Sequence, residues 1–279
     1  MDATLNAAAL SIVVMAAGKG TRMKSALPKV LHPLAGRSLL HHVLATTAGL
    51  GASRTIVITG HEAARVEAAT AGLDRVRCVR QEPQLGTGHA VQQAVPHLGD
   101  AGTTLILNGD VPLIEAATAR ALVAACGGTK LALLTIALAD ASGYGRIVRN
   151  DKQEVRAIVE HKDASGEQRA IREVYTGMLA APTAWLKRAV MALENQNVQQ
   201  EYYLTDIVAM AVAEGMSVVA TQAKSETEVL GVNSPMQLAD LERRFQRRQA
   251  DALMEAGVRL ADPARFDLRG TLQCGQDVS

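Results

Sequence analysis

Residues 10–23 read LSIVVMAAGKGTRM, an apolar run that passes directly into a glycine-rich loop carrying cationic side chains. The apolar run has the length and composition of a buried strand. The glycines after it allow a backbone to approach a ligand closely, and the cations Lys19 and Arg22 indicate that the ligand is an anion. This stretch therefore predicts a strand of an α/β fold with a binding loop at its carboxyl end.

Downstream of this stretch, strand-like and helix-like segments alternate up to about residue 140. We expect further strands over 54–60, 76–81, 103–110 and 130–138, and helices over 38–51, 61–72, 89–98 and 115–126. This alternation indicates a mostly parallel sheet with helices on both faces. Ligands of such sheets bind at the carboxyl ends of the strands, which directs attention to the loops 17–29, 81–88 and 108–112.

The rhythm changes after residue 140. Residues 145–161 are typical of a hairpin, and a strand over 172–182 precedes helices over 183–194 and 203–215 and a strand over 217–223. We therefore expect the α/β core to carry a partly antiparallel insertion. Residues 234–257 form one long charged pattern with few core positions, which predicts a helix that spans between modules.

The composition excludes several classes of function. With 29 cationic and 28 anionic side chains the net charge is +1, and aromatic residues make up 3%, so neither nucleic acid nor a membrane is expected as a partner. The three cysteines have no metal-site spacing, and their odd number fits a reducing cytoplasm better than a disulfide framework. The N-terminal stretch lacks an early Lys or Arg, so no signal peptide is expected.

The opening loop matches neither common phosphate-binding fingerprint. Gly18 and Gly20 begin a G-x-G pattern, but the third glycine of a dinucleotide site would fall at Met23, which argues against a dehydrogenase. The loop also lacks the G-x-x-x-x-G-K-[ST] pattern of a Walker loop. What remains is a tight turn with a cluster of cations, and the alternative is a solvated surface loop. The cations are Lys19, Arg22, Lys24 and Lys29.

Three polar residues at expected strand ends are candidates for binding roles. Asp110, after the strand in LNGDVP, is either a ligand of a hard cation or the cap of a turn. Gln81 precedes LGTG, and its amide offers a donor and an acceptor to the edge of a uracil, although an ordinary glycine turn is the alternative. Glu160 lies in VEHKDA, a charge run that also fits a solvated turn. We expect His61 and His89 to be loop or core histidines.

Taken in order, eight segments resemble one family. They are MAAGKGTRM, LPKVL, QLGTGHA, NGDVPL, GYGRI, VEHKDA, EYYLTDI and GVNS. The chain resembles, over essentially its whole length, the bacterial bifunctional N-acetylglucosamine-1-phosphate uridylyltransferase/glucosamine-1-phosphate acetyltransferases. The resemblance implies a Rossmann-like nucleotidyltransferase of the cytoplasm. Such an enzyme uses UTP, N-acetylglucosamine 1-phosphate and Mg²⁺ to make UDP-N-acetylglucosamine and pyrophosphate for cell-wall and lipopolysaccharide precursors.

The resemblance also assigns roles to residues. It implies that Arg22 and Lys29 are the catalytic cations. The implied nucleotide-binding residues are Ala16, Ala17, Gly18, Lys29, Gln81, Gly86 and Thr87, and the implied Mg²⁺ ligands are Asp110 and Asn233. The implied sugar-binding residues are Asn108, Gly109, Gly145, Glu160, Tyr175 and Asn233. The family commonly has Tyr at position 108 and Asn at position 175, so the contacts of these two side chains are open.

The resemblance also implies that the chain is divided into three segments. Residues 1–233 would form the uridylyltransferase domain, 234–256 a linking helix, and 257–279 the first coil of a left-handed β-helix. The acetyltransferase activity and the homotrimer of the full-length family belong to that β-helix, so this chain is expected to be a monomer without acetyl transfer. The alternatives are a nucleotidyltransferase for another base or sugar and a non-catalytic scaffold, as in translation-factor exchange subunits.

Overall fold

The computed structural model describes residues 9–279, so the start of the stretch in which no signal peptide is expected lies outside the described residues. The main strands are β1 (Leu10–Met15), β4 (Arg54–Thr59), β5 (Val76–Arg80), β6 (Thr103–Asn108), β7 (Leu131–Ala137), β10 (Glu173–Pro182) and β11 (Val218–Gln222). They lie in the order β11-β7-β10-β6-β1-β4-β5. Strands β6, β1, β4 and β5 are parallel neighbours, and β10 runs antiparallel to β6 and β7. The mostly parallel sheet is confirmed.

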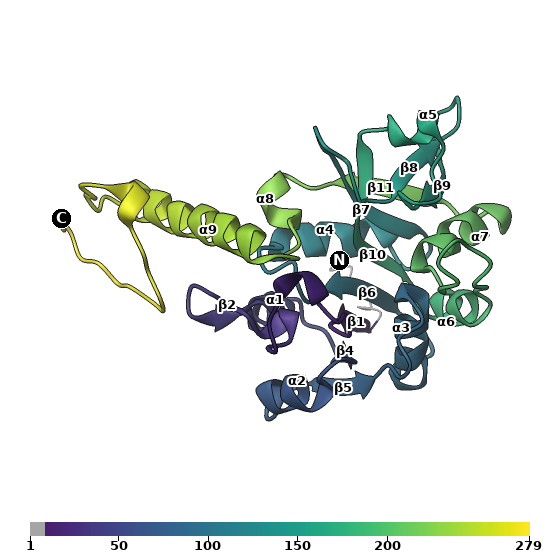
Figure 1. Cartoon of the computed structure of the whole chain (residues 1–279), viewed down its shortest axis with the longest axis horizontal. Coiled ribbons are helices and arrows are strands. Elements are labelled where there is room, and N and C mark those ends of the chain that lie inside the picture. Colours follow the sequence, from purple (N-terminus) through teal and green to yellow (C-terminus); the bar gives the residue numbers. More distant parts are fainter. Residues whose placement is uncertain (1–8) are drawn as a thin grey trace, which may run out of the picture.

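Helices cover both faces of this sheet (Figure 1). They are α1 (Leu39–Ala48), α2 (Ala63–Thr70), α3 (Thr87–Ala94), α4 (Ala116–Cys126), α6 (Thr183–Met191) and α7 (Ile207–Ala213). Alternate residues of a strand face opposite sides, so β1 sends Ile12 and Val14 into the core shared with α1, α2 and α4. Val13 points into the other core, which contains residues of α3, α6 and α7. Because β1 is buried on both faces, its sequence is continuously apolar.

The expected hairpin forms from β8 (Arg146–Arg149) and β9 (Val155–Val159), which pair antiparallel. It joins the sheet through the pairing of Arg146 with Val174 of β10. The register of β10 against β7 shifts between Tyr175 and Leu179, and Gly177 within the shift has a positive φ of 86°. A residue with a side chain rarely adopts this conformation, so glycine is needed where β10 bends. A short helix, α5 (Gly166–Arg169), follows the hairpin.

A smaller core joins early and late parts of the chain. It contains Met23, Leu34, Leu39, Leu113, Val232 and Leu241. Its residues come partly from β2 (Pro33–Leu34), α1 and α9 (Pro235–Glu255). Strand β3 (Arg37–Ser38) pairs with β2, and the short helix α8 (Glu226–Val229) precedes Val232. Ser234 caps α9 by accepting a hydrogen bond from the Gln237 amide. Helix α9 extends away from the sheet (Figure 1), as expected for residues 234–257, whereas the division of the chain into domains stays a prediction.

Residues 257–279 lie beyond α9 and contain a short 3-10 turn, Pro263–Arg265, but no strand. The expected first coil of a left-handed β-helix is therefore not confirmed. The segment is held against α9 through Gln246, whose Oε1 accepts from the Leu268 amide at 2.8 Å and whose Nε2 donates to the Leu268 carbonyl at 3.1 Å. Among residues 9–279, none of the helices combines the length and the apolar character that crossing a membrane requires.

Candidate active site

Predicted binding residues meet at the carboxyl ends of the parallel strands. Strand β1 leads into Ala16–Gly18, β5 into Gln81, and β6 ends at Asn108 ahead of Asp110. These segments line a cavity of about 440 Å³. The predicted residues around it are Ala16, Ala17, Gly18, Lys29, Gln81, Gly86, Thr87, Asn108 and Asp110. We call this space the nucleotide cavity.

A second cavity of about 210 Å³ adjoins the first. Gly145, Glu160 and Tyr175 line it, and Asn108 and Thr87 border both cavities. We call it the sugar cavity. The shared residues make the two cavities parts of one elongated site, which can hold a nucleotide next to a second compound.

Gly109, a predicted sugar-binding residue, lines neither cavity. Its amide donates to the Met15 carbonyl at 2.9 Å and so joins β6 to β1. A Cβ at this position would lie 3.1 Å from the same carbonyl oxygen. The structure therefore gives Gly109 the role of close packing between the two strand ends.

The predicted metal ligands converge on the ammonium group of Lys29. Lys29 Nζ donates to Asp110 Oδ2 and, at 3.0 Å, to Asn233 Oδ1. The segment that carries Asn233 is bound to the backbone of Asp110, because the Val232 amide donates to the Asp110 carbonyl at 3.0 Å. A carboxylate oxygen and an amide oxygen therefore point at one cation from strands and loops far apart in sequence.

This donor set fits Mg²⁺. Proteins commonly hold Mg²⁺ with one or two carboxylates and complete its shell with substrate phosphates and water. Residues 9–279 contain no cluster of three or more His, Cys, Asp or Glu side chains that could hold a metal alone. Asp110 and Asn233 would therefore hold the metal with water or phosphate oxygens completing its shell, and the Lys29 ammonium marks the position where a cation is favourable.

Two cations close to Gly20 differ in their positions. Arg22 is exposed on the 3-10 turn Thr21–Met23 and lines neither cavity, so its predicted catalytic role stays a prediction. Lys19 lines the nucleotide cavity instead. In the sequence, Lys19 is a loop cation between two glycines, but this pattern did not show that Lys19, rather than Arg22, lines the cavity.

The amide of Gln81 has a defined orientation. Its side chain is 4% exposed, and Nε2 donates to the Gly86 carbonyl at 2.9 Å and lies 3.2 Å from Nδ1 of His89. A carbonyl can only accept, so the nitrogen must face Gly86 and Oε1 is left for a ligand. His89, expected to be a loop or core residue, therefore contacts a site residue.

The segment Glu201–Leu204 closes the nucleotide cavity around the loop that follows Gln81. Gly86 has a positive φ of 105°, and a Cβ there would lie 2.7 Å from the Tyr202 carbonyl oxygen. Thr87 Oγ1 accepts from the Leu204 amide at 3.0 Å. Glu201 lines the cavity. It begins the segment EYYLTDI, which was part of the family resemblance, but no role was assigned to Glu201. Gly86 and Thr87 thus serve the close packing of this loop.

Two ionisable groups are buried at the sugar cavity. Burial raises the pKa of Glu160, and the nearby carboxylates of Asp163 and Asp206 raise it further. The hydrogen bond that Thr205 Oγ1 donates to Glu160 at 3.1 Å lowers this pKa and so opposes the shift. Burial also raises the pKa of Tyr175, and its hydroxyl has no hydrogen-bond partner within residues 9–279. A buried polar group without a partner is costly, so a ligand that pairs with this hydroxyl would be favoured.

Asn108, at a position where the resembled family commonly has Tyr, also has a structural role. Asn108 Nδ2 donates to the Thr176 carbonyl at 3.3 Å, which ties the end of β6 to the bend of β10. The Asn108 side chain therefore supports the wall between the two cavities.

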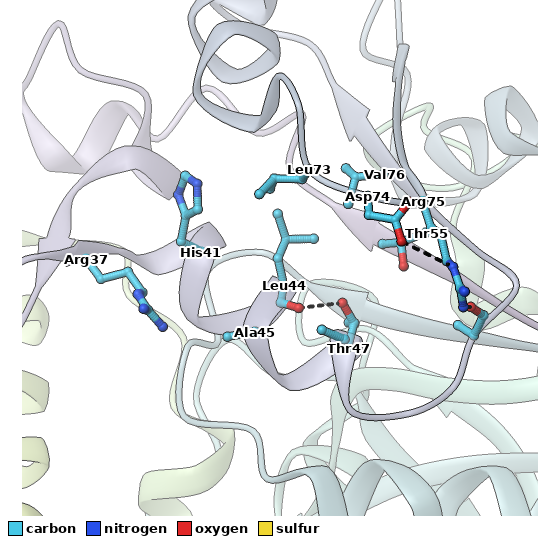
Figure 2. A pocket seen from close by; sticks show the side chains of 12 residues that line it. Arg37, His41, Leu44, Ala45, Thr47, Thr55, Leu73, Asp74, Arg75 and Val76 are labelled. Carbon is cyan, nitrogen blue, oxygen red and sulfur yellow. Dashed lines mark hydrogen bonds and ion pairs between the residues drawn. The ribbon is translucent and has the colours of Figure 1, made fainter. Parts of the chain in front are cut away.

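Another cavity, of about 570 Å³, is larger than the nucleotide cavity and lies elsewhere. Figure 2 shows its lining, most of which comes from α1 and from residues 73–76, with Arg37, Ala52 and Thr55 completing it. It lies at the amino ends of β4 and β5, whereas ligands of open α/β sheets bind at the carboxyl ends. Thr47 in its wall is already bonded to the Leu44 carbonyl, and the Asp74–Arg75 pair is exposed. Size alone therefore does not make it the active site.

Comparison with known proteins gives the family. The sequence profile of the MobA-like NTP transferase domain matches residues 12–177. The chain belongs to this family. The family match contains every predicted site residue from Ala16 to Tyr175 and leaves Asn233 and α9 outside.

Curated relatives and solved structures agree with the family. The chain is 73% identical over 275 residues to the bifunctional protein GlmU of Methylibium petroleiphilum, covering 96% of this chain and 60% of the relative. It is 62% identical to GlmU of Polaromonas naphthalenivorans, covering 96% and 59%. The chain thus spans about 60% of the length of these relatives.

The solved structures support the fold alone. A nucleotidyl transferase from Methanothermobacter superposes with a TM-score of 0.59 at 23% identity, covering 86% of this chain and 99% of that one. A UDP-glucose pyrophosphorylase complexed with UDP-glucose superposes with a TM-score of 0.68 at 16% identity, also covering 86% and 99%.

Proposed function

We propose that the chain transfers a uridylyl group from UTP to N-acetylglucosamine 1-phosphate and releases pyrophosphate. The observation that carries the proposal is the pair of adjoining cavities at the carboxyl edge of the sheet. One cavity holds Gln81 and the cation site, and the other holds Glu160 and Tyr175. In this arrangement a nucleotide and a sugar phosphate would meet beside Asn108 and Asp110.

The chain's residues would act by neutralising and positioning charge. The attacking phosphate oxygen is already an anion, so no general base is required, and the obstacles are the repulsion between two anions and the charge that grows on the leaving pyrophosphate. Lys19 and Lys29 lie where they can offset this charge, and Gly18 leaves open space, since an added Cβ there would meet nothing within 4 Å. Mg²⁺ held between Asp110 and Asn233 would supply further neutralisation.

Base selection would rest on the fixed amide of Gln81. Its Oε1 can accept from the N3–H of uracil. Cytosine has an acceptor at N3, so it would need the amide to turn over. Turning would place Oε1 against the Gly86 carbonyl, which the amide nitrogen now binds at 2.9 Å. The backbone therefore favours uracil over cytosine.

Sugar selection would rest on Glu160 and Tyr175. When ionised, Glu160 can accept from an N–H or O–H of the sugar, and the partnerless Tyr175 hydroxyl can donate to a sugar oxygen. The free cysteines Cys78 and Cys126 fit a reducing compartment, so we propose the cytoplasm. The monomeric state of this chain stays a prediction, as does the homotrimer of full-length relatives.

Pyrophosphate release tests the proposal. Purified protein with UTP, Mg²⁺ and N-acetylglucosamine 1-phosphate is expected to release pyrophosphate, and Asp110→Asn to lose at least about 100-fold in rate, as when an electrostatic catalytic group is removed. Asp74→Asn, at an exposed position, is the control. Equal rates with CTP or another sugar phosphate would favour the alternative specificity. Folded protein without any release would favour the non-catalytic scaffold.

A further inference from the structure

His89 contacts Gln81, the residue that would face the base of the nucleotide in the proposed function. Gln81 Nε2 is 3.2 Å from His89 Nδ1, and the other ring nitrogen, Nε2, is 3.1 Å from the amide nitrogen of Gln93. The imidazole therefore stands between two glutamine side chains. His89 itself lines neither the nucleotide cavity nor the sugar cavity, so it can affect a ligand only through Gln81.

The chemistry of the ring decides which glutamine donates to it. A neutral imidazole has one acceptor nitrogen and one N–H, so the two amide nitrogens cannot both donate to the ring. The Gly86 carbonyl fixes the nitrogen of Gln81 toward the ring, since that carbonyl can only accept. His89 Nδ1 must then be the acceptor, and Nε2 carries the proton. The Gln93 amide nitrogen donates to the His89 carbonyl at 3.2 Å, and Gln93 gives up this bond when its amide turns to accept from Nε2–H.

The packing around His89 disfavours protonation of the ring. Burial lowers the pKa of His89. The Tyr202 ring lies across it with a centroid separation of 6.2 Å, and the Gly88 amide donates to the Tyr202 carbonyl at 2.7 Å. On the other elements around the ring the facing groups are the neutral amides of Gln81 and Gln93, and Glu201 lines the nearby cavity.

We propose that His89 is a positioning residue for base selection: its Nδ1 accepts from Gln81 and keeps Oε1 of Gln81 toward the base, so protonation of His89 weakens the preference for UTP over CTP. This inference rests on the proposed function for the identity of the nucleotide.

Protonation of His89 removes the acceptor that orients the Gln81 amide. Imidazolium carries N–H on both nitrogens and accepts nothing. Nδ1–H would then face the amide hydrogens of Gln81, and turning the amide would oppose Oε1 to the Gly86 carbonyl. Neither orientation satisfies all groups, so the amide loses its single position. The UTP preference is expected to fall as the pH drops below the range in which His89 is neutral.

The experiment measures UTP and CTP binding and turnover from pH 5 to pH 8 on the full chain. In the wild type we expect the UTP:CTP ratio to fall by roughly tenfold toward acid pH, as for a buried polar group that loses its partner. His89→Asn keeps an acceptor near Nδ1 but does not titrate, so its ratio should stay high and independent of pH. His89→Leu removes the acceptor and should have a low ratio throughout. His97→Asn, at a second partly buried histidine just beyond α3, is the matched control.

A second measurement does not depend on turnover. Nitrogen-15 shifts of the His89 ring should show Nδ1 without a proton and Nε2 with one at pH 8. The Nδ1–H tautomer would overturn the inference. A UTP:CTP ratio that does not change with pH in the wild type would also overturn it, as would a ratio in His89→Asn that falls with pH as the wild-type ratio does. If Gln81→Ala leaves the ratio unchanged while UTP still binds, base selection lies elsewhere. If UTP does not bind at all, the proposed function fails with it.

Discussion

At the scale of single residues, Lys29 occupies the oxygens that we propose as ligands of a metal ion. Its ammonium binds Asp110 Oδ2 and Asn233 Oδ1. A divalent cation could use these oxygens only after the ammonium had moved away. In the proposed function, Lys29 would then couple the arrival of the metal to the delivery of a positive charge to the nucleotide.

Lys29→Met is therefore expected to bind Mn²⁺ more tightly than the wild type in the absence of nucleotide. Removing a charge-assisted bond of about 1.5–3 kcal/mol corresponds to roughly 10- to 100-fold in affinity. Titration calorimetry with Mn²⁺ measures the change, and Lys24→Met, at an exposed position of the same loop, is the control. Unchanged or weaker binding by Lys29→Met would show that the ammonium does not compete.

Glu160 couples stability to sugar binding. Its pKa is raised by burial, so the folded state favours the protonated carboxyl. The stability this group provides is present below its ordinary pKa and is lost as the pH rises through the raised value. At neutral pH the buried carboxylate therefore lowers the free energy of unfolding.

We expect Glu160→Gln to have a higher melting temperature than the wild type at pH 7.5, and the gain to disappear near pH 4. The same substitution should raise the KM for the sugar phosphate with little change in the KM for UTP, because a neutral amide is a weaker acceptor. Melting curves at both pH values and steady-state kinetics test this, with the exposed Glu194→Gln as control. A loss of stability at pH 7.5 would contradict the proposed environment of Glu160.

Sequence patterns located candidate residues that share a cavity where the end of a strand determines the position of the residue. Ala16–Gly18, Gln81 and Asp110 were placed at strand ends by apolar runs that stop at a polar residue, and the structure brings them to one cavity. Arg22 and Lys19 were not separated in the same way, because which cation of a loop faces the cavity depends on the 3-10 turn Thr21–Met23.

At the scale of elements, the bend of β10 shapes the wall of the sugar cavity. Gly177 has a positive φ, and a Cβ there would lie 2.2 Å from Asn108 Nδ2. That side chain is the one that bonds the Thr176 carbonyl. The end of β6 and the bend of β10 are therefore fitted to each other.

Gly177→Ala is expected to destabilise the protein by roughly 1–3 kcal/mol, because alanine is strained at this φ and displaces Asn108. Urea unfolding measures the stability, and the kinetics should show a larger rise in KM for the sugar phosphate than for UTP. Gly166→Ala, where an added Cβ meets nothing within 4 Å, is the control. Equal stability of Gly177→Ala and Gly166→Ala would mean that the bend tolerates a side chain.

The sequence could place β10 but not its bend. The apolar run over 172–182 indicates a strand, and the structure confirms Glu173–Pro182. The shift between Tyr175 and Leu179 depends on pairing with β7 and β6, which lie far away in the chain. The start of α3 shows the same limit, because Thr87 and Gly88 join the helix expected from residue 89 once Tyr202 packs against them.

At the scale of the whole molecule, helix α9 completes the site from outside the family match. Its Leu241 packs in the small core with Met23 of the binding loop and Val232, the residue before Asn233. This core therefore helps to place Asn233, a proposed metal ligand late in the chain, near the earlier residues Lys29 and Asp110. The pattern of residues 234–257 did not indicate this packing, because it is typical of a charged helix with few core positions.

Leu241→Ala should therefore weaken the metal site as well as the fold. Leu241 is 1% exposed, and truncating a buried leucine to alanine costs about 2–5 kcal/mol. If the small core fixes Asn233, the loss will appear as weaker Mn²⁺ binding by protein that is still folded, and as faster proteolysis at the start of α9. Met236→Ala changes the same helix at a side chain that is 84% exposed, so it should leave both properties unchanged. Lower stability of Leu241→Ala with unaltered Mn²⁺ affinity would show that Asn233 is held independently of α9, through the bond between Val232 and Asp110 alone.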